Sequence, residues 1–208
     1  MQISSRIIRQ KGRRKRIRIV GGELSGRRIR APSGRLVRPT GERVREAAFN
    51  SLKDHLAGAH VLDLYAGSGA MGLESLSWGA QYCLFVEPNR HARAAIRANI
   101  ATLALTQRSE LWPITAERAT RDLSEQRRRF DLIVCDPPWG DGLIQDVRRA
   151  LPGLLDRAGT LLVEHPVGKD FGPFENLTLW KQRQYGGTLL SYWIWAPKSS
   201  IIHEVEST

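Results

Sequence analysis

The residues best suited to chemistry stand at the end of an apolar run, where residues 130–135 are followed by Asp136, Pro137, Pro138 and Trp139. Prolines cannot donate hydrogen bonds to a sheet ladder, so they explain why a strand stops here. They do not explain the carboxylate of Asp136, which can accept hydrogen bonds. Nor do they explain the indole of Trp139, which offers a flat face for stacking. The motif is either a strand-ending turn or part of a site that handles a substrate.

A second group combines two acids with a glycine-rich turn. Asp63 ends an apolar run, Gly67 and Gly69 follow it, and Glu87 ends the next apolar run. Glycines in such a turn let the backbone approach a ligand closely. No Lys followed by Ser or Thr comes after the glycines, and Asp63 would repel a pyrophosphate, so the turn suits a cationic ligand. Glu87 occupies the position whose carboxylate binds ribose hydroxyls in doubly wound folds, although an ordinary surface glutamate is the alternative.

The elements that must position these groups alternate between strands and helices. Apolar periodicity predicts strands over 60–66, 82–88, 109–115, 130–136 and 159–166, and helices over 41–56, 70–79, 89–105, 116–126 and 143–155. Thr40 is the expected cap of the first helix. Two long strands within 177–197 meet at Gly186-Gly187, which indicates a hairpin. This alternation predicts an α/β fold with a parallel sheet covered on both faces, and ligands bind beyond the carboxyl ends of such strands.

Positive charge is concentrated near the N-terminus. The chain has 208 residues and a net charge of +11, and residues 1–45 contain fifteen Lys and Arg against two Glu, a balance of +13. Such a block favours a polyanionic partner over a merely solubilising tail. We expect a disordered basic arm over 1–16, a β-hairpin and helix extension over 17–56, one catalytic-type domain over 57–197 and a tail over 198–208.

The remaining composition excludes several protein classes. Cys83 and Cys135 lie in apolar runs, which indicates reduced core thiols and neither a disulfide framework nor a zinc site. No apolar run is long enough to cross a bilayer, and no apolar segment follows the basic N-terminus as it does in a secretory signal. We therefore expect a cytoplasmic, monomeric protein without a metal.

The motifs resemble those of a known enzyme class. The stretches "DLYAGSGAMGLE", "FVEP" and "DPPW" are similar to those of Rossmann-like, seven-stranded methyltransferases that use S-adenosyl-L-methionine. The N-terminal stretch "RIVGGELSGRRIRAPSGRLVRPTGERVREAAFNSL", joined to "VLDLYAGSGAMGLESLSWGA", closely resembles the RsmD family. That resemblance covers roughly residues 17–197. It implies methylation of the exocyclic N2 amine of a guanine in 16S ribosomal RNA, on free RNA or on a small-subunit particle.

The resemblance also assigns roles to individual residues. It implies that the catalytic residues are Asp136, Pro137, Pro138 and Trp139. It implies that the cofactor-binding residues are Asp63, Ala66, Gly67, Ser68, Gly69, Glu87, Pro88, Ala116 and Glu117. The residues expected to contact RNA are Arg13, Arg14, Lys15, Arg16, Arg38, Arg43 and Arg45.

Within the implied reaction, Asp136 and the carbonyl of Pro137 accept the two N–H bonds of the amine and aim its lone pair at the methyl group. Trp139 stacks on the base. Two alternatives stay open: an adenine-N6 methyltransferase acting on DNA or RNA, and a non-catalytic RNA-binding factor in ribosome assembly. Residues 164–166 end the strand predicted over 159–166, and Glu164 has either a part in the base pocket or a structural role.

Overall fold

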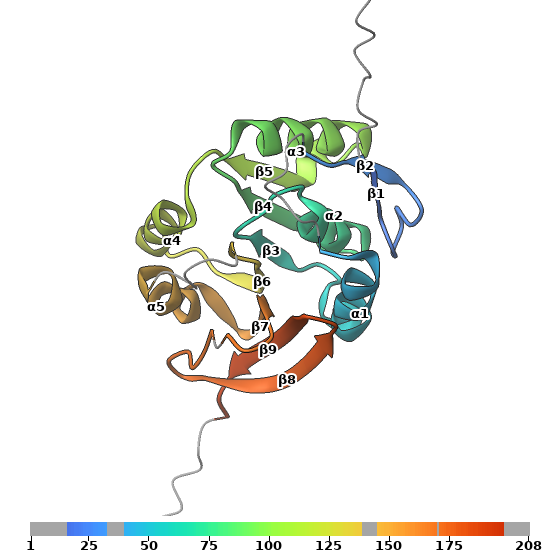
Figure 1. Ribbon diagram of the computed structural model, residues 1–208. Coiled ribbons are helices and arrows are strands. Elements are labelled where there is room, and N and C mark those ends of the chain that lie inside the picture. The colour runs from blue at the N-terminus through green and yellow to red at the C-terminus, as the bar shows by residue number, and fades with distance from the viewer. Residues whose placement is uncertain (1–15, 33–39, 139–144, 170, 198–208) are drawn as a thin grey trace, which may run out of the picture.

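The computed structural model describes residues 16–32, 40–138, 145–169 and 171–197. Two sheets are formed, a two-stranded ribbon and a seven-stranded sheet of order β5-β4-β3-β6-β7-β9-β8 (Figure 1). The strands of the large sheet are β3 (His60–Asp63), β4 (Tyr82–Val86), β5 (Ser109–Trp112), β6 (Phe130–Cys135), β7 (Leu155–Pro166), β8 (Leu177–Tyr185) and β9 (Thr188–Trp195). The first five are mutually parallel, whereas β9 pairs antiparallel with both β7 and β8. The predicted fold class and terminal hairpin are confirmed.

Helices cover both faces of this sheet. The helices α1 (Glu42–Leu52), α2 (Ala70–Ser77) and α3 (Arg90–Thr102) lie on one face, while α4 (Ala116–Glu125) and α5 (Gln145–Leu154) lie on the other (Figure 1). Two short 3-10 helices, η1 (Lys53–His55) and η2 (Thr106–Arg108), follow α1 and α3. Neighbouring strand residues alternate between the two cores, as with Val61 and Leu62 of β3. This alternation follows from the period of two in a strand and gives each face its own apolar layer.

The ribbon consists of β1 (Arg16–Arg18) and β2 (Arg28–Arg30), paired antiparallel. Both strands read Arg-Ile-Arg, and their central residues Ile17 and Ile29 are buried in the same core as α1, α2 and α3. The backbone between the strands packs against the end of α2, because a Cβ on Gly22 would lie 1.9 Å from the carbonyl oxygen of Ser77. The ribbon is thereby fixed to the main sheet and its helices.

Some element boundaries differ from the sequence expectation. Gly41, and not Thr40, stands at the N-terminal boundary of α1, and no side chain caps that helix. The hydroxyl of Thr40 instead reaches across to β7, as described below. Strand β7 begins at Leu155, four residues before the predicted start, and its register with β6 shifts between Phe130 and Leu132. Within the described residues, no helix combines the length and apolar composition that crossing a membrane requires.

Candidate functional site

A cavity of about 680 Å³ lies at the carboxyl ends of the parallel strands. Four carboxylates line it, Asp63, Glu87, Asp136 and Glu164, and its described lining contains no Lys or Arg. The other lining residues are Thr40, Gly41, Val44, Tyr65, Ala66, Gly67, Ser68, Ala70, Met71, Pro88, Pro137, Pro138, Tyr185, Gly186, Gly187 and Thr188. An acidic cavity in a basic protein favours ligand groups that are cationic or that donate hydrogen bonds.

One half of the cavity is built on β3 and the turn into α2. Asp63 is buried at the end of β3, and its Oδ2 accepts a hydrogen bond of 2.9 Å from the backbone N–H of Gly72. Burial raises the pKa of Asp63 from 3.8 to about 7, the Gly72 N–H opposes that rise and the nearby Glu87 adds to it. Gly69 precedes α2 with a φ of 75°, a left-handed conformation that favours glycine. The turn therefore holds a carboxylate that is partly protonated near neutral pH.

Glu87, which follows β4, joins that turn to the start of α3. Its Oε2 accepts a hydrogen bond of 2.8 Å from the N–H of Gly67, and its Oε1 accepts one of 2.7 Å from the N–H of Asn89. The side chain of Asn89 caps α3 by accepting from the N–H groups of His91 and Ala92. Glu87 is 8% exposed. It is thus a buried, hydrogen-bonded acid that faces the cavity, unlike an ordinary surface glutamate.

The remaining predicted cofactor residues divide into two groups. Ala66, Ser68 and Pro88 line the cavity together with the residues above. Ala116 and Glu117 instead begin α4 and are absent from the described lining. Tyr65 lines the cavity, and the pKa of its phenol is raised. Burial is the largest cause of this rise, followed by the nearby Cys135 and then by Glu117.

The other half of the cavity is built where β6 and β7 end. The parallel register pairs Cys135 with Val163, so Asp136 and Glu164 follow at neighbouring strand positions. The hydroxyl of Thr40 lies 2.7 Å from Oε2 of Glu164 and 3.4 Å from Oδ2 of Asp136. Burial, the charge of Glu164 and that of Asp63 raise the pKa of Asp136 well above its ordinary value, against a smaller opposing effect of Thr40. Pro137 and Pro138 line the cavity, whereas Trp139 lies outside the described residues.

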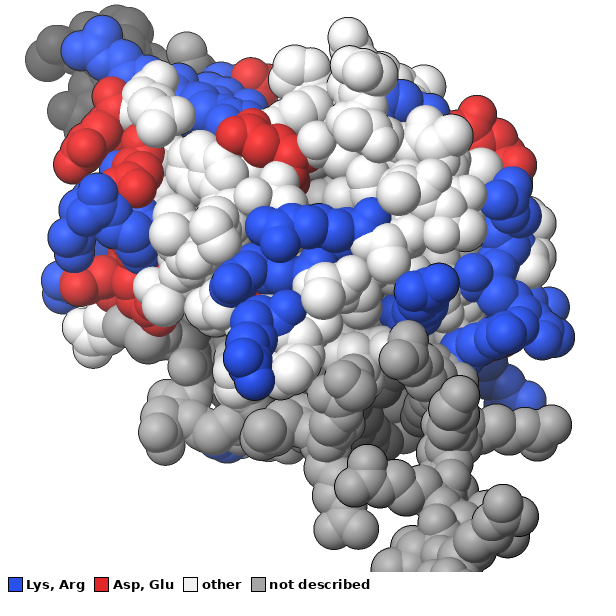
Figure 2. Space-filling view, turned by 90° about the horizontal axis from the view of Figure 1, so that it is seen from above, with Lys and Arg blue, Asp and Glu red and all other residues white. Residues whose placement is uncertain are grey.

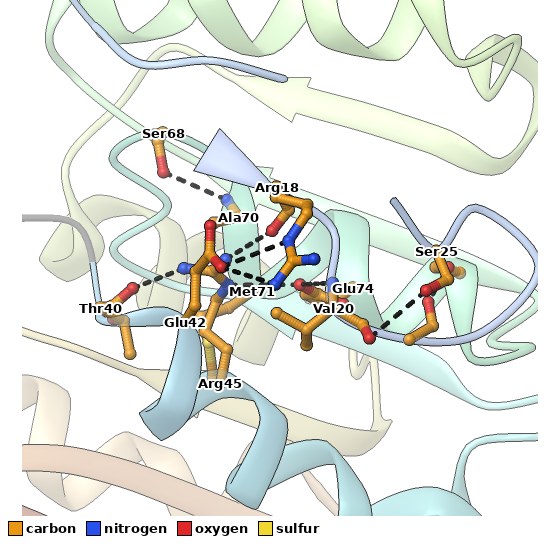
Figure 3. Close-up of polar contacts among 12 residues, drawn as sticks. Arg18, Val20, Ser25, Thr40, Glu42, Arg45, Ser68, Ala70, Met71 and Glu74 are labelled. Carbon is orange, nitrogen blue, oxygen red and sulfur yellow. Dashed lines mark hydrogen bonds and ion pairs between the residues drawn. The ribbon is translucent and has the colours of Figure 1, made fainter. Parts of the chain in front are cut away.

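Arg45 is not an exposed phosphate-binding residue, and that expectation is wrong. It is 1% exposed and forms an ion pair of 3.2 Å with Glu74 of α2, which is fully buried (Figure 3). Its guanidinium also donates to the carbonyl oxygens of Thr40 at 2.5 Å and Arg18 at 2.6 Å. Oε1 of Glu74 accepts from the N–H of Val20 as well, at 2.8 Å. This network joins the ribbon, the start of α1 and α2, and it includes Thr40, which lines the cavity.

The other residues expected to contact RNA fall into two sets. Arg16 and Arg43 are exposed, on β1 and α1. Arg13, Arg14, Lys15 and Arg38 lie outside the described residues. The structure adds exposed basic side chains that the sequence expectation did not include, on β1 and β2, namely Arg18, Arg28 and Arg30. Figure 2 looks down on the side where α3 and the ribbon lie. Basic groups gather in its centre and at its right, whereas acidic groups lie mainly in its upper part and at its left.

Sequence reasoning missed several residues that line the cavity. Thr40 appeared to be a helix cap, and Val44 and Tyr65 appeared to be ordinary apolar positions. The turn of the terminal hairpin, residues 185–188, also lines the cavity, although it follows Asp136 by about fifty residues. Glu164 carried a signal, since an acid at the end of a parallel strand lies at the ligand-binding edge of the sheet.

Comparisons relate this chain to named proteins. The family model described as conserved hypothetical protein 95 matches residues 17–194. The ribosomal RNA small subunit methyltransferase D of Escherichia coli (strain K12) is 34% identical over 153 residues, which cover 73% of this chain and 75% of that protein. A solved structure from Thermus thermophilus, of a protein described as hypothetical, has a TM-score of 0.74 at 27% identity and covers 86% of this chain and 99% of its own.

A more distant structure shares the fold. It is the 16S rRNA N2 G1207 methyltransferase of T. thermophilus, solved in complex with AdoMet and guanosine. It has a TM-score of 0.66 at 22% identity, over 88% of this chain and 50% of its own. The family model spans most of the present sequence, and the E. coli relative is matched over three quarters of its length. The predicted family is therefore confirmed: this chain belongs to the conserved hypothetical protein 95 family, the RsmD family of methyltransferases.

Proposed function

We propose that this protein uses S-adenosylmethionine to methylate the exocyclic N2 amine of a guanine in 16S ribosomal RNA. The observation that carries the proposal is one continuous cavity, which joins the glycine turn, Asp63 and Glu87 on one side to Asp136 and Pro137 on the other. Two substrates that exchange a group must meet in one space. The name of the E. coli relative supports methylation of small-subunit ribosomal RNA, and the structure from T. thermophilus, which shares the fold, is named as an N2 methyltransferase of 16S rRNA.

The residues around the glycine turn fit this cofactor. Its sulfonium and ammonium groups are cationic, and Asp63 is a buried acid at the end of the strand that leads into the turn. Glu87 directly follows the neighbouring strand β4, where a carboxylate can accept hydrogen bonds from the two ribose hydroxyls. When bound, the cofactor supplies an electrophilic methyl group for in-line transfer to nitrogen.

The residues after β6 fit an amine acceptor. The lone pair of an exocyclic amine is delocalised into the base, so the nitrogen is a weak nucleophile. The Asp136 carboxylate and the Pro137 carbonyl can accept its two N–H bonds, which draws the nitrogen toward tetrahedral geometry. These hydrogen bonds strengthen as positive charge develops on nitrogen, and they therefore stabilise mainly the transition state. The nitrogen then loses one proton through Asp136 to water, which leaves a neutral methylated amine.

The ribbon is the proposed contact with the RNA backbone. Its exposed arginines lie on two strands that are hydrogen-bonded, through α3, to the glycine turn on the cofactor side of the site. The side chain of Asn99 in α3 accepts from the N–H of Arg30 at 2.8 Å and donates to its carbonyl oxygen at 3.0 Å. The same amide donates to the carbonyl oxygen of Ser68 in the glycine turn at 3.4 Å. Phosphates bound along the ribbon would therefore have a fixed position relative to the reaction centre.

The function is tested by mapping the methylated nucleoside. The protein is incubated with labelled S-adenosylmethionine and small-subunit particles that lack the modification, and in parallel with naked 16S RNA. We expect N2-methylguanosine at one position, identified by nucleoside mass spectrometry. N6-methyladenosine would instead support the adenine alternative, and RNA binding without methylation would support a non-catalytic assembly factor.

Cofactor affinity is expected to rise with pH up to about 7, because the pKa of Asp63 is raised to about 7. Below that pH Asp63 is protonated, and binding a cation must first remove the proton, which weakens affinity roughly tenfold per pH unit. Calorimetry between pH 5 and 7 measures this, a range in which an α-amino group stays protonated. The Asp63→Asn variant keeps an acceptor for the Gly72 N–H and should bind weakly with little pH dependence. An unchanged slope in that variant would assign the dependence to another group.

Removing charge from the ribbon is expected to weaken RNA binding without affecting the cofactor. In an Arg28→Ala/Arg30→Ala variant, two phosphate contacts are lost. The slope of log affinity against log salt should therefore shrink by about 1.4 to 1.8. Filter binding with 16S RNA at several salt concentrations measures the slope. Arg121→Ala is the matched control, since Arg121 is exposed on α4 at the opposite face of the sheet. Equal slopes in both variants would show that RNA does not follow the ribbon.

A further inference from the structure

We propose that Glu164, positioned by Thr40, reads the N1–H of the target base and thereby selects guanine over adenine. The inference rests on the proposed function and assigns a specificity-determining residue to the same site. Its basis is the position of the Glu164 carboxylate beside Asp136, within the cavity that would receive the base.

The strand pairing sets the two carboxylates side by side. Strands β6 and β7 are parallel neighbours, and Asp136 and Glu164 each come one position after the paired residues Cys135 and Val163. Both side chains line the cavity. The Thr40 hydroxyl lies between them, 2.7 Å from the Glu164 carboxylate and 3.4 Å from the Asp136 carboxylate. Two acceptors on adjacent strands can therefore meet two neighbouring donors of one planar ligand.

Two acids buried side by side favour a ligand that donates hydrogen bonds. Glu164 is 6% exposed, and it lines the cavity beside Asp136. The charge of Glu164 contributes to the raised pKa of Asp136, which shows that the two carboxylates interact. A ligand that donates to both acids relieves this repulsion. The site is thus complementary to a ligand edge that carries donors on adjacent atoms.

Guanine offers that edge, and adenine does not. Guanine presents N1–H beside its N2 amine, so the amine can face Asp136 while N1–H faces Glu164. Adenine presents its N6 amine beside N1, which is an acceptor and would oppose the Glu164 carboxylate. Cytosine has the same mismatch, because N3 next to its N4 amine is also an acceptor. A site built to take a hydrogen bond from its substrate rejects analogues that lack the donor.

The first arm of the test measures which base edge the wild-type protein accepts. Guanosine, inosine, 2-aminopurine riboside and adenosine are compared as inhibitors of 16S RNA methylation. Guanosine and inosine carry N1–H, whereas the other two nucleosides have an acceptor at N1. We expect guanosine to inhibit about 10-fold to 100-fold more strongly than 2-aminopurine riboside, the range for one hydrogen bond to a charged group. Equal inhibition by these two nucleosides, or none by either, contradicts the inference.

The second arm compares Glu164→Gln with Glu125→Gln, a matched change on the exposed surface of α4. Glutamine keeps the shape and an acceptor for Thr40 but lacks the charge. We expect kcat/KM for RNA methylation to fall about 10-fold to 100-fold in Glu164→Gln, with unchanged cofactor affinity. The preference for guanosine over 2-aminopurine riboside should also shrink. Thr40→Val, which removes the bridging hydroxyl, should shift the preference in the same direction.

The outcomes separate this inference from the function on which it rests. If the wild-type protein forms no N2-methylguanosine, the proposed function is overturned. If it forms N2-methylguanosine while Glu164→Gln retains the wild-type nucleoside preference, only the role of Glu164 is overturned. A loss of activity together with an unchanged preference would identify Glu164 as a structural residue.

Discussion

Replacing Asp136 with alanine is expected to reduce the rate of methyl transfer by about 100-fold or more, the effect of losing one well-placed electrostatic group. The carboxylate accepts an N–H bond that strengthens as the amine becomes positively charged, so its loss acts mainly on the transition state. Cofactor affinity should change little, because Asp63 ends β3 and Glu87 follows β4, whereas Asp136 follows β6. Single-turnover methylation of 16S RNA at saturating cofactor measures the effect.

Asp136→Asn refines this expectation. The amide keeps the shape and one acceptor oxygen but loses the charge, so its rate should lie between those of the wild type and the alanine variant. Thermal unfolding should accompany both measurements, since Asp136 also lies 3.4 Å from the Thr40 hydroxyl. Methylation at the wild-type rate by a folded Asp136→Ala protein would show that this carboxylate has no catalytic role and only follows the end of a strand.

Arg45→Ala is expected to lower the free energy of unfolding by about 3 to 5 kcal/mol, the range for breaking a buried ion pair. Arg45 and Glu74 are 1% and 0% exposed, so removing the guanidinium leaves a carboxylate without its charged partner in the core. It also removes a donor from the carbonyl oxygens of Thr40 and Arg18. Urea unfolding at neutral pH measures the loss.

Two variants identify the cause of that loss. Arg43→Ala removes an exposed arginine from the same helix and should change the free energy of unfolding by less than about 0.5 kcal/mol. The double variant Arg45→Met/Glu74→Gln fills the space with an apolar side chain and removes the unpaired charge. Its glutamine still offers an acceptor to the Val20 N–H, so it should recover part of the stability. If Arg45→Ala and Arg43→Ala proved equally stable, the buried pair would have no net stabilising role.

Much of the site followed from local sequence because parallel strands bring their carboxyl ends to one edge. The alternation of strands and helices predicted the sheet. Glu87 and Asp136 stood at the ends of predicted strands, and Asp63 stood within the strand that precedes the glycine turn. Their meeting in one cavity needs no knowledge of other contacts once the sheet is parallel. The paired glycines at 186 and 187 predicted the hairpin turn in the same way, since β8 ends at Tyr185 and β9 begins at Thr188.

The buried role of Arg45 could not be predicted from local sequence. It lies on the same helical face as Ala48, Phe49 and Leu52, all of them buried, so the spacing did contain a signal. An arginine on an apolar stripe can nevertheless extend to solvent or stay inside, and the choice depends on a partner. Only the packing of α1 against α2 supplied that partner, Glu74, which lies 29 positions further along the chain.

The sequence by itself thus determined the fold, the family and the acids at the strand ends, because periodicity, turn chemistry and motifs act over short distances along the chain. The tertiary structure decided which side chains complete the cavity. Thr40, which was expected to cap a helix, instead lies between Asp136 and Glu164, which are 96 and 124 positions away in the sequence. Such contacts depend on strand order and helix packing, and these are fixed by burial of the whole core and not by any local pattern.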